Sequence, residues 1–486
     1  MDARVTKWIV VFSVVITLHA VAAPVQHHSV IKRAMAWMHE HPVMGPAGRS
    51  VASVEIFPES GQHFVYVVHL SPKGYLILNS NEHPASVVSF SPDASVDLSA
   101  DPTNAFRSML LRHVERMERQ PAQARTVLGQ TSSGFEAMTE MHGPFLDTTW
   151  NQGHPYNKMC QVVPDGLKGL NDRAPTGCVA TAYAQLLQFH RWPLFGKGAH
   201  AYTDTSGSVT GTHYADFADT YDWASMLTSY AVFNPNPVEA EDAVAELMRE
   251  LGIAVEANYE AGGTTASTWT LGDRLSEYFF FEPIEYHAWQ ADLMASMARD
   301  LRAGFPCVVS IPGHSVVTDG LMVDQGVTTY HINFGWGGKN NGWWTVDNVA
   351  GSPIESGITS LKPRLIAMPQ TPVMHSRLGE PVDLRWLLPR QRENEATQLN
   401  IHRLEQQAGI WQSDASDMAA GTTSHWHVVP GGHSGHCWFA GPNGRAWMML
   451  DEVFVPDVST DLTFWLSRRL GMATFSVEVL ADNGRT

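Results

Sequence analysis

The stretch PTGCVATAYAQLLQFHRWP, residues 175–193, decides how the rest of the chain is interpreted. Residues that can share one helical face recur at positions i, i+3, i+4, i+7, i+8 and i+11, namely Val179, Ala182, Tyr183, Leu186, Leu187 and His190. This spacing predicts a helix with one buried face. Thr176 or Gly177 can cap its start and Pro193 prevents its continuation, so Cys178 falls in the first turn.

Cys178 lies where a helix favours a reactive thiolate. A thiol in the first turn faces unpaired backbone N–H groups and the positive end of the helix dipole, and both favour the charged form. The other interpretation is a small buried apolar residue. A nucleophile is therefore indicated only if other parts of the sequence supply the groups that thiol chemistry needs.

Composition limits the classes of protein that need to be considered. The chain has 486 residues, which is too long for one core, so two to four domains are expected. It contains 44% hydrophobic residues and carries a formal charge of −17 spread along the sequence. The absence of a basic patch argues against nucleic acid as a partner.

The cysteine count argues against a disulfide scaffold. Four cysteines in a chain of this size are too few for one, namely Cys160, Cys178, Cys307 and Cys437. If Cys178 is a free thiol, the other three cannot all pair. Pairing of Cys160 with Cys307 or with Cys437 stays open.

Residues 1–22 have the pattern of a secretory signal peptide. Arg4 and Lys7 precede an apolar run over residues 8–18, and Ala20 and Ala22 form a small-x-small cleavage site. The apolar run is short for a membrane span, although an uncleaved anchor is the alternative. We expect a secreted or cell-surface protein.

Three further units are expected after this segment. Residues 23–140 hold a short helix, several strands and a helix over residues 104–119, followed by a polar linker over residues 121–139. Residues 141–368 show helices first, including residues 238–251 closed by Gly252 and residues 293–303, and then strands near residues 307–346, which predicts an α+β domain. Residues 369–486 alternate at strand length, which is typical of an all-β sandwich.

The 141–368 unit also supplies the partners that a cysteine nucleophile requires. These are a base, a group that orients the base, and donors for the oxyanion. His314 occurs at a turn leading into an apolar strand, and Asn333 can accept a hydrogen bond from an imidazole and fix its tautomer. The side-chain amide of Gln152, with the backbone N–H of Cys178, can bind the oxyanion.

These motifs resemble the streptopain family of secreted cysteine peptidases, which have a papain-like fold. The similarity lies in WNQGHPYN (residues 150–157), TGCVATA (176–182), GHS (313–315) and HINFGWGG (331–338). Two positions differ from the family pattern. Phe334 occurs where a Trp is usual, and Ser315-Val316 where Ala-Phe is common.

The resemblance implies hydrolysis of peptide bonds in protein or peptide substrates, without a cofactor or metal. Cys178 would be the nucleophile, His314 the general base and then acid, and Gln152 part of the oxyanion hole, while Asn333 or Trp336 would orient or shield the imidazole. The first unit would be an inhibitory propeptide that covers the cleft. We therefore expect a zymogen that is cut between residues 121 and 143.

Two other functions stay open at this stage. The chain could be a surface adhesion or binding protein that acts through its C-terminal sandwich, or a thiol amidase for non-protein amides. The C-terminal tryptophans suit either a carbohydrate platform or a sandwich core, with core packing favoured. His425, His427, His433, His436 and Cys437 are metal-binding residue types, but no ligand spacing is evident, so a solvated loop is preferred.

Overall fold

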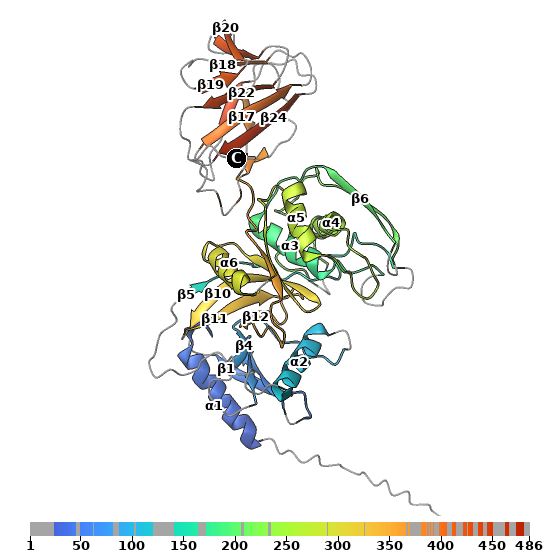
Figure 1. The fold of residues 1–486 in the computed structure, drawn as a ribbon, viewed down its shortest axis with the longest axis vertical. Helices are drawn as coiled ribbons and strands as arrows, with labels where there is room; N and C mark the ends of the chain where they lie inside the picture. Colours follow the sequence, from blue (N-terminus) through green and yellow to red (C-terminus); the bar gives the residue numbers. More distant parts are fainter. Residues whose placement is uncertain are drawn as a thin grey trace, which may run out of the picture.

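The computed structural model describes most of the chain up to residue 365 and separate strands beyond it (Figure 1). The described residues are 24–44, 49–61, 63–80, 87–101, 104–119, 140–163, 172–205, 209–231, 235–288, 290–324 and 326–365, and beyond these residues 389 and 392 and the strands given below. The predicted signal peptide and the predicted linker over residues 121–139 lie outside the described residues. Within them, no helix is long and apolar enough to cross a membrane.

In the N-terminal unit, one helix precedes a run of four strands in the sequence and another helix follows it. Its described elements are α1 (Pro24–Glu40), the 3-10 turn η1 (Pro42–Met44), β1 (Ser50–Phe57), β2 (Val65–Ser71), β3 (Tyr75–Asn79), β4 (Val87–Ser91) and α2 (Ala105–Arg119). Every residue of β3 and β4 is buried, as expected of apolar strands inside a sheet. The helix predicted at residues 104–119 is present as α2.

One continuous sheet joins this unit to the next. The order β1-β2-β3-β4-β12-β11-β10-β9-β13-β8 crosses the predicted domain boundary, because Phe90 of β4 pairs with Trp343 of β12. The further strands are β5 (Glu140–His142), β8 (Glu285–His287), β9 (Cys307–Ile311), β10 (His314–Asp324), β11 (Val327–Asn333), β12 (Gly342–Trp344) and β13 (Ser356–Thr359). A single apolar cluster contains Val65 and Phe106 from the first unit and Val309 and Trp344 from the second.

Helices gather beside this sheet in the second unit. They are α3 (Cys178–His190), α4 (Val238–Ala254), α5 (Thr268–Tyr278) and α6 (Gln290–Arg302), with a separate hairpin of β6 (Ala199–Asp204) and β7 (Gly211–Asp216). In Figure 1, α3, α4 and α5 form one group, and α6 lies over the strands. Helix α3 contacts α4, α5 and β10, and residues 179–188 are all buried, so the predicted helix is buried on every side and not on one face alone.

Gly252 does not end its helix, so the predicted C-cap is wrong. Helix α4 continues through it to Ala254. A Cβ atom at position 252 would lie 2.2 Å from the hydroxyl oxygen of Tyr259, so glycine serves here to let that buried ring pack against the helix. Helix α5 was missed, although Ser267 caps it by accepting a hydrogen bond from the Thr270 N–H at 3.2 Å.

The C-terminal region consists of paired antiparallel strands. Its two larger sheets have the orders β19-β22-β17-β24 and β18-β21-β20. The strands are β14 (Met368–Pro369), β15 (Pro381–Leu384), β16 (Trp386–Leu387), β17 (Gln398–Glu405), β18 (Trp411–Asp414), β19 (Gly421–Ser424), β20 (Trp426–Pro430), β21 (His436–Ala440), β22 (Arg445–Leu450), β23 (Leu462–Trp465) and β24 (Ala473–Leu480). All the helices and strands described beyond residue 365 are strands, and the predicted sandwich packing stays a prediction. Side-chain packing in this region lies outside what the structure describes.

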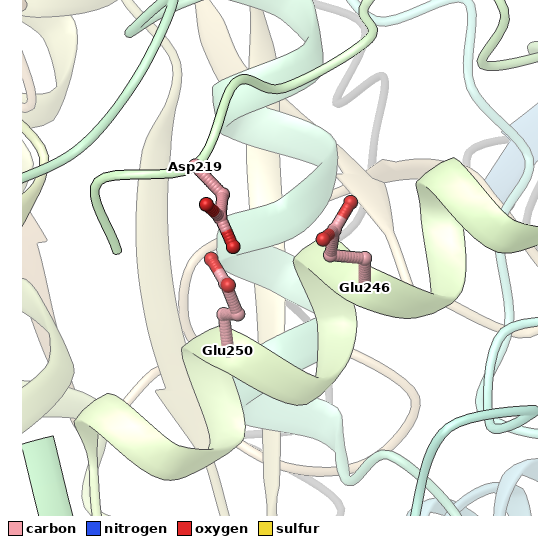
Figure 2. Close-up of side chains that lie close together, drawn as sticks. All are labelled: Asp219, Glu246 and Glu250. Carbon is pink, nitrogen blue, oxygen red and sulfur yellow. The ribbon is translucent and has the colours of Figure 1, made fainter. Parts of the chain in front are cut away.

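Three carboxylates meet between α4 and the loop before it (Figure 2). Oxygen atoms of Asp219, Glu246 and Glu250 lie within 4.8 Å of one another. Glu250 is 3% exposed, and the hydroxyl of Tyr221 donates a hydrogen bond to it at 2.5 Å. Burial, together with the neighbouring acids, raises the pKa of Glu250 to about 8. Between pH 4.5 and 8 the folded chain therefore binds a proton here that the unfolded chain releases.

This difference predicts that Glu250 costs stability as the pH rises from about 4.5 to about 8. Replacement by Gln keeps an acceptor for Tyr221 but removes the titration. We expect Glu250→Gln to raise the free energy of unfolding at pH 8, by on the order of 4 kcal/mol, and to leave it nearly unchanged at pH 4. Urea unfolding at both pH values measures this. Exposed Glu239 on the same helix is the control, and an equal gain for Glu239→Gln would contradict the assignment.

Candidate active site

Cys178 is the first residue of α3, as predicted. Gly177 is the N-cap residue, with φ of +86°, and a Cβ atom at this position would lie 3.0 Å from the carbonyl oxygen of Thr264. Only glycine combines that backbone angle with so close an approach. The sequence before the helix therefore fixes the half-buried, free thiol of Cys178 at the start of its first turn.

His314 is brought to this thiol from the sheet. It is the first residue of β10, and it follows Gly313, which has a φ of +75°. Burial by itself raises the pKa of the Cys178 thiol, but hydrogen bonding to His314, the charge of His314 and hydrogen bonding to Ser315 bring this pKa below its ordinary value.

The imidazole of His314 is held on two other sides. Its Nε2 atom lies 2.8 Å from the carbonyl oxygen of Phe334. Since a carbonyl can only accept, Nε2 carries the proton, and Nδ1 is the basic nitrogen of the neutral ring. The ring of Trp336 stacks on the imidazole with centroids 4.6 Å apart and planes at 21°. Trp336 therefore shields the ring, as one of the two sequence alternatives held.

Asn333 lies in the strand that leads to this carbonyl, but its amide bonds elsewhere. It donates to the Thr148 carbonyl at 3.0 Å and to the Gln185 Oε1 atom at 3.2 Å, and it accepts from the Gly335 N–H at 3.0 Å. The expectation that its side chain holds the imidazole does not match this geometry. The physical reason is that the backbone of the next residue already occupies Nε2.

Gln152 lies at the wall of a cavity of about 330 Å³. The backbone carbonyl of Gln152 accepts a hydrogen bond from the Thr176 N–H at 3.1 Å, which links the Gln152 segment to the residues just before α3. The cavity is lined from the second unit by Asn151, Gln152, Trp336, Lys339 and Asn340, and from the first by Asp97, Ser99, Asp101, Asn104, Ala105 and Phe106. The N-terminal unit thus forms one wall of a cavity that contains two of the predicted site residues.

Some contacts of the site were not foreseen. The Phe334 carbonyl is a backbone group, so its side chain gives no signal. Gln185 has a sequence signal, because it shares a helical face with Cys178 at i+7. In the structure its side chain is fully buried and accepts a hydrogen bond from the Trp150 N–H at 3.3 Å. The hydroxyl of Ser315 was noted only as a difference from the family pattern.

The other described cysteines are chemically quiet. Cys160 and Cys307 are free and buried, so they form no disulfide with each other. Burial raises the pKa of Cys160 to about 12 and also raises that of Cys307. Cys437 lies in a described strand, but nothing is described of its side chain. Of the three free cysteines described, Cys178 alone has a lowered pKa.

An α+β domain with a cysteine at the start of its central helix, facing a histidine at the start of a sheet strand, defines the papain-like class of cysteine peptidases. Residues 150–344 match the model of the Peptidase C10 family. Residues 150–344 therefore form a domain of the streptopain-like family of cysteine peptidases.

Individual relatives agree with this assignment. Streptopain of Streptococcus pyogenes is 25% identical over 60% of this chain and 76% of its own length. The thiol protease/hemagglutinin PrtT of Porphyromonas gingivalis is 29% identical over 40% of this chain and 22% of its own. A fragment of prointerpain A from Prevotella intermedia shares the fold, with a TM-score of 0.51 and 23% identity over 64% of this chain and all of that one.

The geometry predicts that Asn333 stabilises the turn at residues 333–335 and does not affect the pKa of the Cys178 thiol. Asn333→Ala should lower the free energy of unfolding by about 2–3 kcal/mol, because it leaves buried partners unsatisfied. The pH midpoint for iodoacetamide labelling of Cys178 should stay where it is, since the Phe334 carbonyl still holds His314. Asn236, in a surface loop, is the control. A clear shift of the midpoint would show that Asn333 orients the imidazole after all.

Proposed function

We propose that this chain is a cysteine endopeptidase that is exported as a zymogen and hydrolyses peptide bonds through an acyl-enzyme. The observation that carries the proposal is that His314 lowers the pKa of the Cys178 thiol, while the Phe334 carbonyl fixes the imidazole and Trp336 covers it. A thiolate and an imidazolium side by side give a nucleophile at neutral pH and a proton ready for the leaving group.

Each group has a definite step in this reaction. The Cys178 sulfur attacks the peptide carbonyl carbon, and the oxyanion is bound by the amide of Gln152 and the backbone N–H of Cys178. His314 then gives its proton to the leaving amine, which departs as the acyl-enzyme forms. In the second half, the neutral imidazole takes a proton from water, the resulting hydroxide attacks the thioester, and the free thiolate is regenerated.

The N-terminal unit is proposed to be the inhibitor. Lys339 pairs with Asp97 at 2.7 Å, and Asn340 bonds to the Ser95 carbonyl through its N–H at 2.7 Å and to the Asp97 N–H through its side chain at 2.9 Å. Phe106 packs edge-on against Phe334 and Trp336, the residues that hold the imidazole. The unit therefore occupies one side of the cleft that a substrate would have to enter.

We assign the proposed parts as residues 1–22 for the signal peptide, 23–140 for the propeptide, 141–368 for the peptidase and 369–486 for a C-terminal β-sandwich. Maturation would cut between residues 121 and 143. The paired sheets of the C-terminal strands support an accessory domain, whose role would be contact with a surface or carbohydrate. Its tryptophans make that contact chemically reasonable.

Casein digestion with and without a thiol-directed epoxide tests the activity. The processed chain should cleave casein, the epoxide should label Cys178 and stop cleavage, and Cys178→Ala should be inactive. Labelling without cleavage of casein would favour an amidase for non-protein amides. Neither labelling nor cleavage would overturn the peptidase assignment and favour a binding protein. Mass spectrometry of the secreted form determines both termini.

Latency should depend on the fit of Tyr75 over β12. Its hydroxyl donates to the carbonyls of Asn340 and Asn341, both at 3.1 Å, and a Cβ atom at Gly342 would lie 2.2 Å from it. Gly342→Ala should therefore push the N-terminal unit away, and the lag before casein cleavage by the full chain should shorten several-fold. Activity after complete processing should change little, because the clash involves the removed unit.

Gly211 provides the matched control for this substitution. It also begins a strand, and a Cβ atom there would meet nothing within 4 Å. Gly211→Ala should keep the original lag. An unchanged lag in Gly342→Ala, measured with a processed enzyme of normal thermal stability, would contradict the role of the N-terminal unit as the inhibitor.

A further inference from the structure

The turn that follows Trp336 places a lysine at the cavity beside the catalytic groups. Of the five described residues that line this cavity from the second unit, Lys339 is the one with a charged side chain. The N-terminal unit lines the same cavity with two acids, Asp97 and Asp101. The Nζ atom of Lys339 lies 2.7 Å from the carboxylate of Asp97, and this hydrogen bond lowers the pKa of Asp97 to about 2. The N-terminal unit thus covers the charge of Lys339 with a carboxylate of its own.

The backbone around Asp97 is bound by the same turn. The Asn340 N–H donates to the Ser95 carbonyl at 2.7 Å, and the Asn340 side chain accepts from the Asp97 N–H at 2.9 Å. A peptide of almost any sequence can form such bonds, because they use main-chain groups. Residues 95–97 therefore meet the turn as a short peptide does, with the backbone at Asn340 and the carboxylate at Lys339.

The turn is held by contacts within the second unit. The Gly337 N–H donates to the Trp150 carbonyl at 3.0 Å, and the Phe334 N–H donates to the Asn341 side chain at 3.0 Å. All four of these residues belong to the second unit. Removal of the N-terminal unit would therefore leave the turn in place and would expose Lys339 without the carboxylate that now faces it.

The position of the turn assigns it to the leaving-group side of a substrate. Trp336 covers the imidazole of His314, the group that gives its proton to the leaving amine in the proposed reaction. The residues joined to that amine therefore run along the Trp336 side of the site. The cavity that Trp336 lines continues to Lys339, whose N–H donates to the Trp336 carbonyl at 3.3 Å. A side chain in the place of Asp97 consequently belongs to a residue beyond the first one after the cleaved bond.

We propose that Lys339 is a specificity-determining residue that selects substrates with an acidic side chain at the second or third residue after the cleaved bond. Asp97 holds the place of that side chain until the N-terminal unit is removed. The inference rests on the proposed function, because it requires that Cys178 and His314 cleave peptide bonds. In the substrate complex, Lys339 binds the carboxylate and Asn340 binds the backbone of the same residue.

The exposure of the ion pair sets the size of the effect. Lys339 is 56% exposed in its pair with Asp97, so water and salt screen the attraction. Pairs of this kind change an equilibrium by a few-fold and not by orders of magnitude. Since the leaving peptide departs when the acyl-enzyme forms, the preference acts on kcat/KM and not on the later hydrolysis of the thioester.

The test compares peptides that differ in charge at these two positions. The processed enzyme obtained from the full chain is given quenched fluorescent peptides based on one casein segment, with Asp, Asn or Lys at the second or the third residue after the cleaved bond. Mass spectrometry confirms which bond is cut. At one of the two positions we expect kcat/KM for the Asp peptide to exceed that for the Asn peptide about three- to fivefold, with the Lys peptide lowest. About 0.5 M NaCl should bring the three values together.

Variants of the lysine separate its charge from other effects. Lys339→Gln should bring the ratio of kcat/KM for the Asp and Asn peptides to about one, Lys339→Arg should keep the ratio, and Lys339→Glu should make the Lys peptide the preferred one. Lys197→Gln is the matched control, because Lys197 is exposed and lies outside the cavity lining. Equal values for the Asp and Asn peptides in the wild-type enzyme, or an Asp preference that survives in Lys339→Glu, would refute the proposal.

The outcomes separate this inference from the proposed function. Cleavage of all the peptides at equal rates refutes the role of Lys339 and leaves the peptidase assignment standing. If the chain leaves casein and every peptide intact, the peptidase assignment fails and the role of Lys339 fails with it.

Discussion

The hydrogen bond from His314 Nε2 to the Phe334 carbonyl is the contact on which the rest of the site depends. It decides which nitrogen is basic, and it fixes the ring plane against which Trp336 stacks. The carbonyl is itself held because Asn333 bonds Gly335 on one side and the Phe334 N–H donates to the Asn341 side chain at 3.0 Å. A backbone group held in this way has no rotamer to lose, so the imidazole is oriented at low entropic cost.

The same strand connection explains why the N-terminal unit bears so directly on the chemistry. The rings of Phe334 and Trp336 contact Phe106 of α2. The 339–341 segment that follows them bonds to Asp97 and Tyr75. A movement of the N-terminal unit would therefore displace Phe334 and Trp336, the residues in contact with the imidazole. The proposed inhibition would then come from shared packing as well as from a blocked entrance.

Cys178, His314 and helix α3 are predictable from the sequence because their patterns are local: helical spacing, a capping glycine, and a histidine before an apolar strand. Contacts that depend on tertiary structure are not. The sheet that runs from β1 to β8 through Phe90 and Trp343 carries no local signal at residue 140. Gly252 has the pattern of a helix end, because nothing in the local sequence shows that the ring of Tyr259 packs against the helix at this position. Backbone acceptors such as the Phe334 carbonyl are invisible to any pattern of side chains.

If the N-terminal unit is removed as proposed, the continuous sheet means that its removal changes more than access to the cleft. Strand β12 is the edge strand of the peptidase part of the sheet, and its pairing with β4 covers that edge. Removal of the first four strands would leave β12 with unpaired backbone groups beside the buried indoles of Trp343 and Trp344. The mature enzyme would then carry an adhesive strand edge that its precursor lacks, and its solubility and self-association would differ from those of the zymogen even where the catalytic groups are identical.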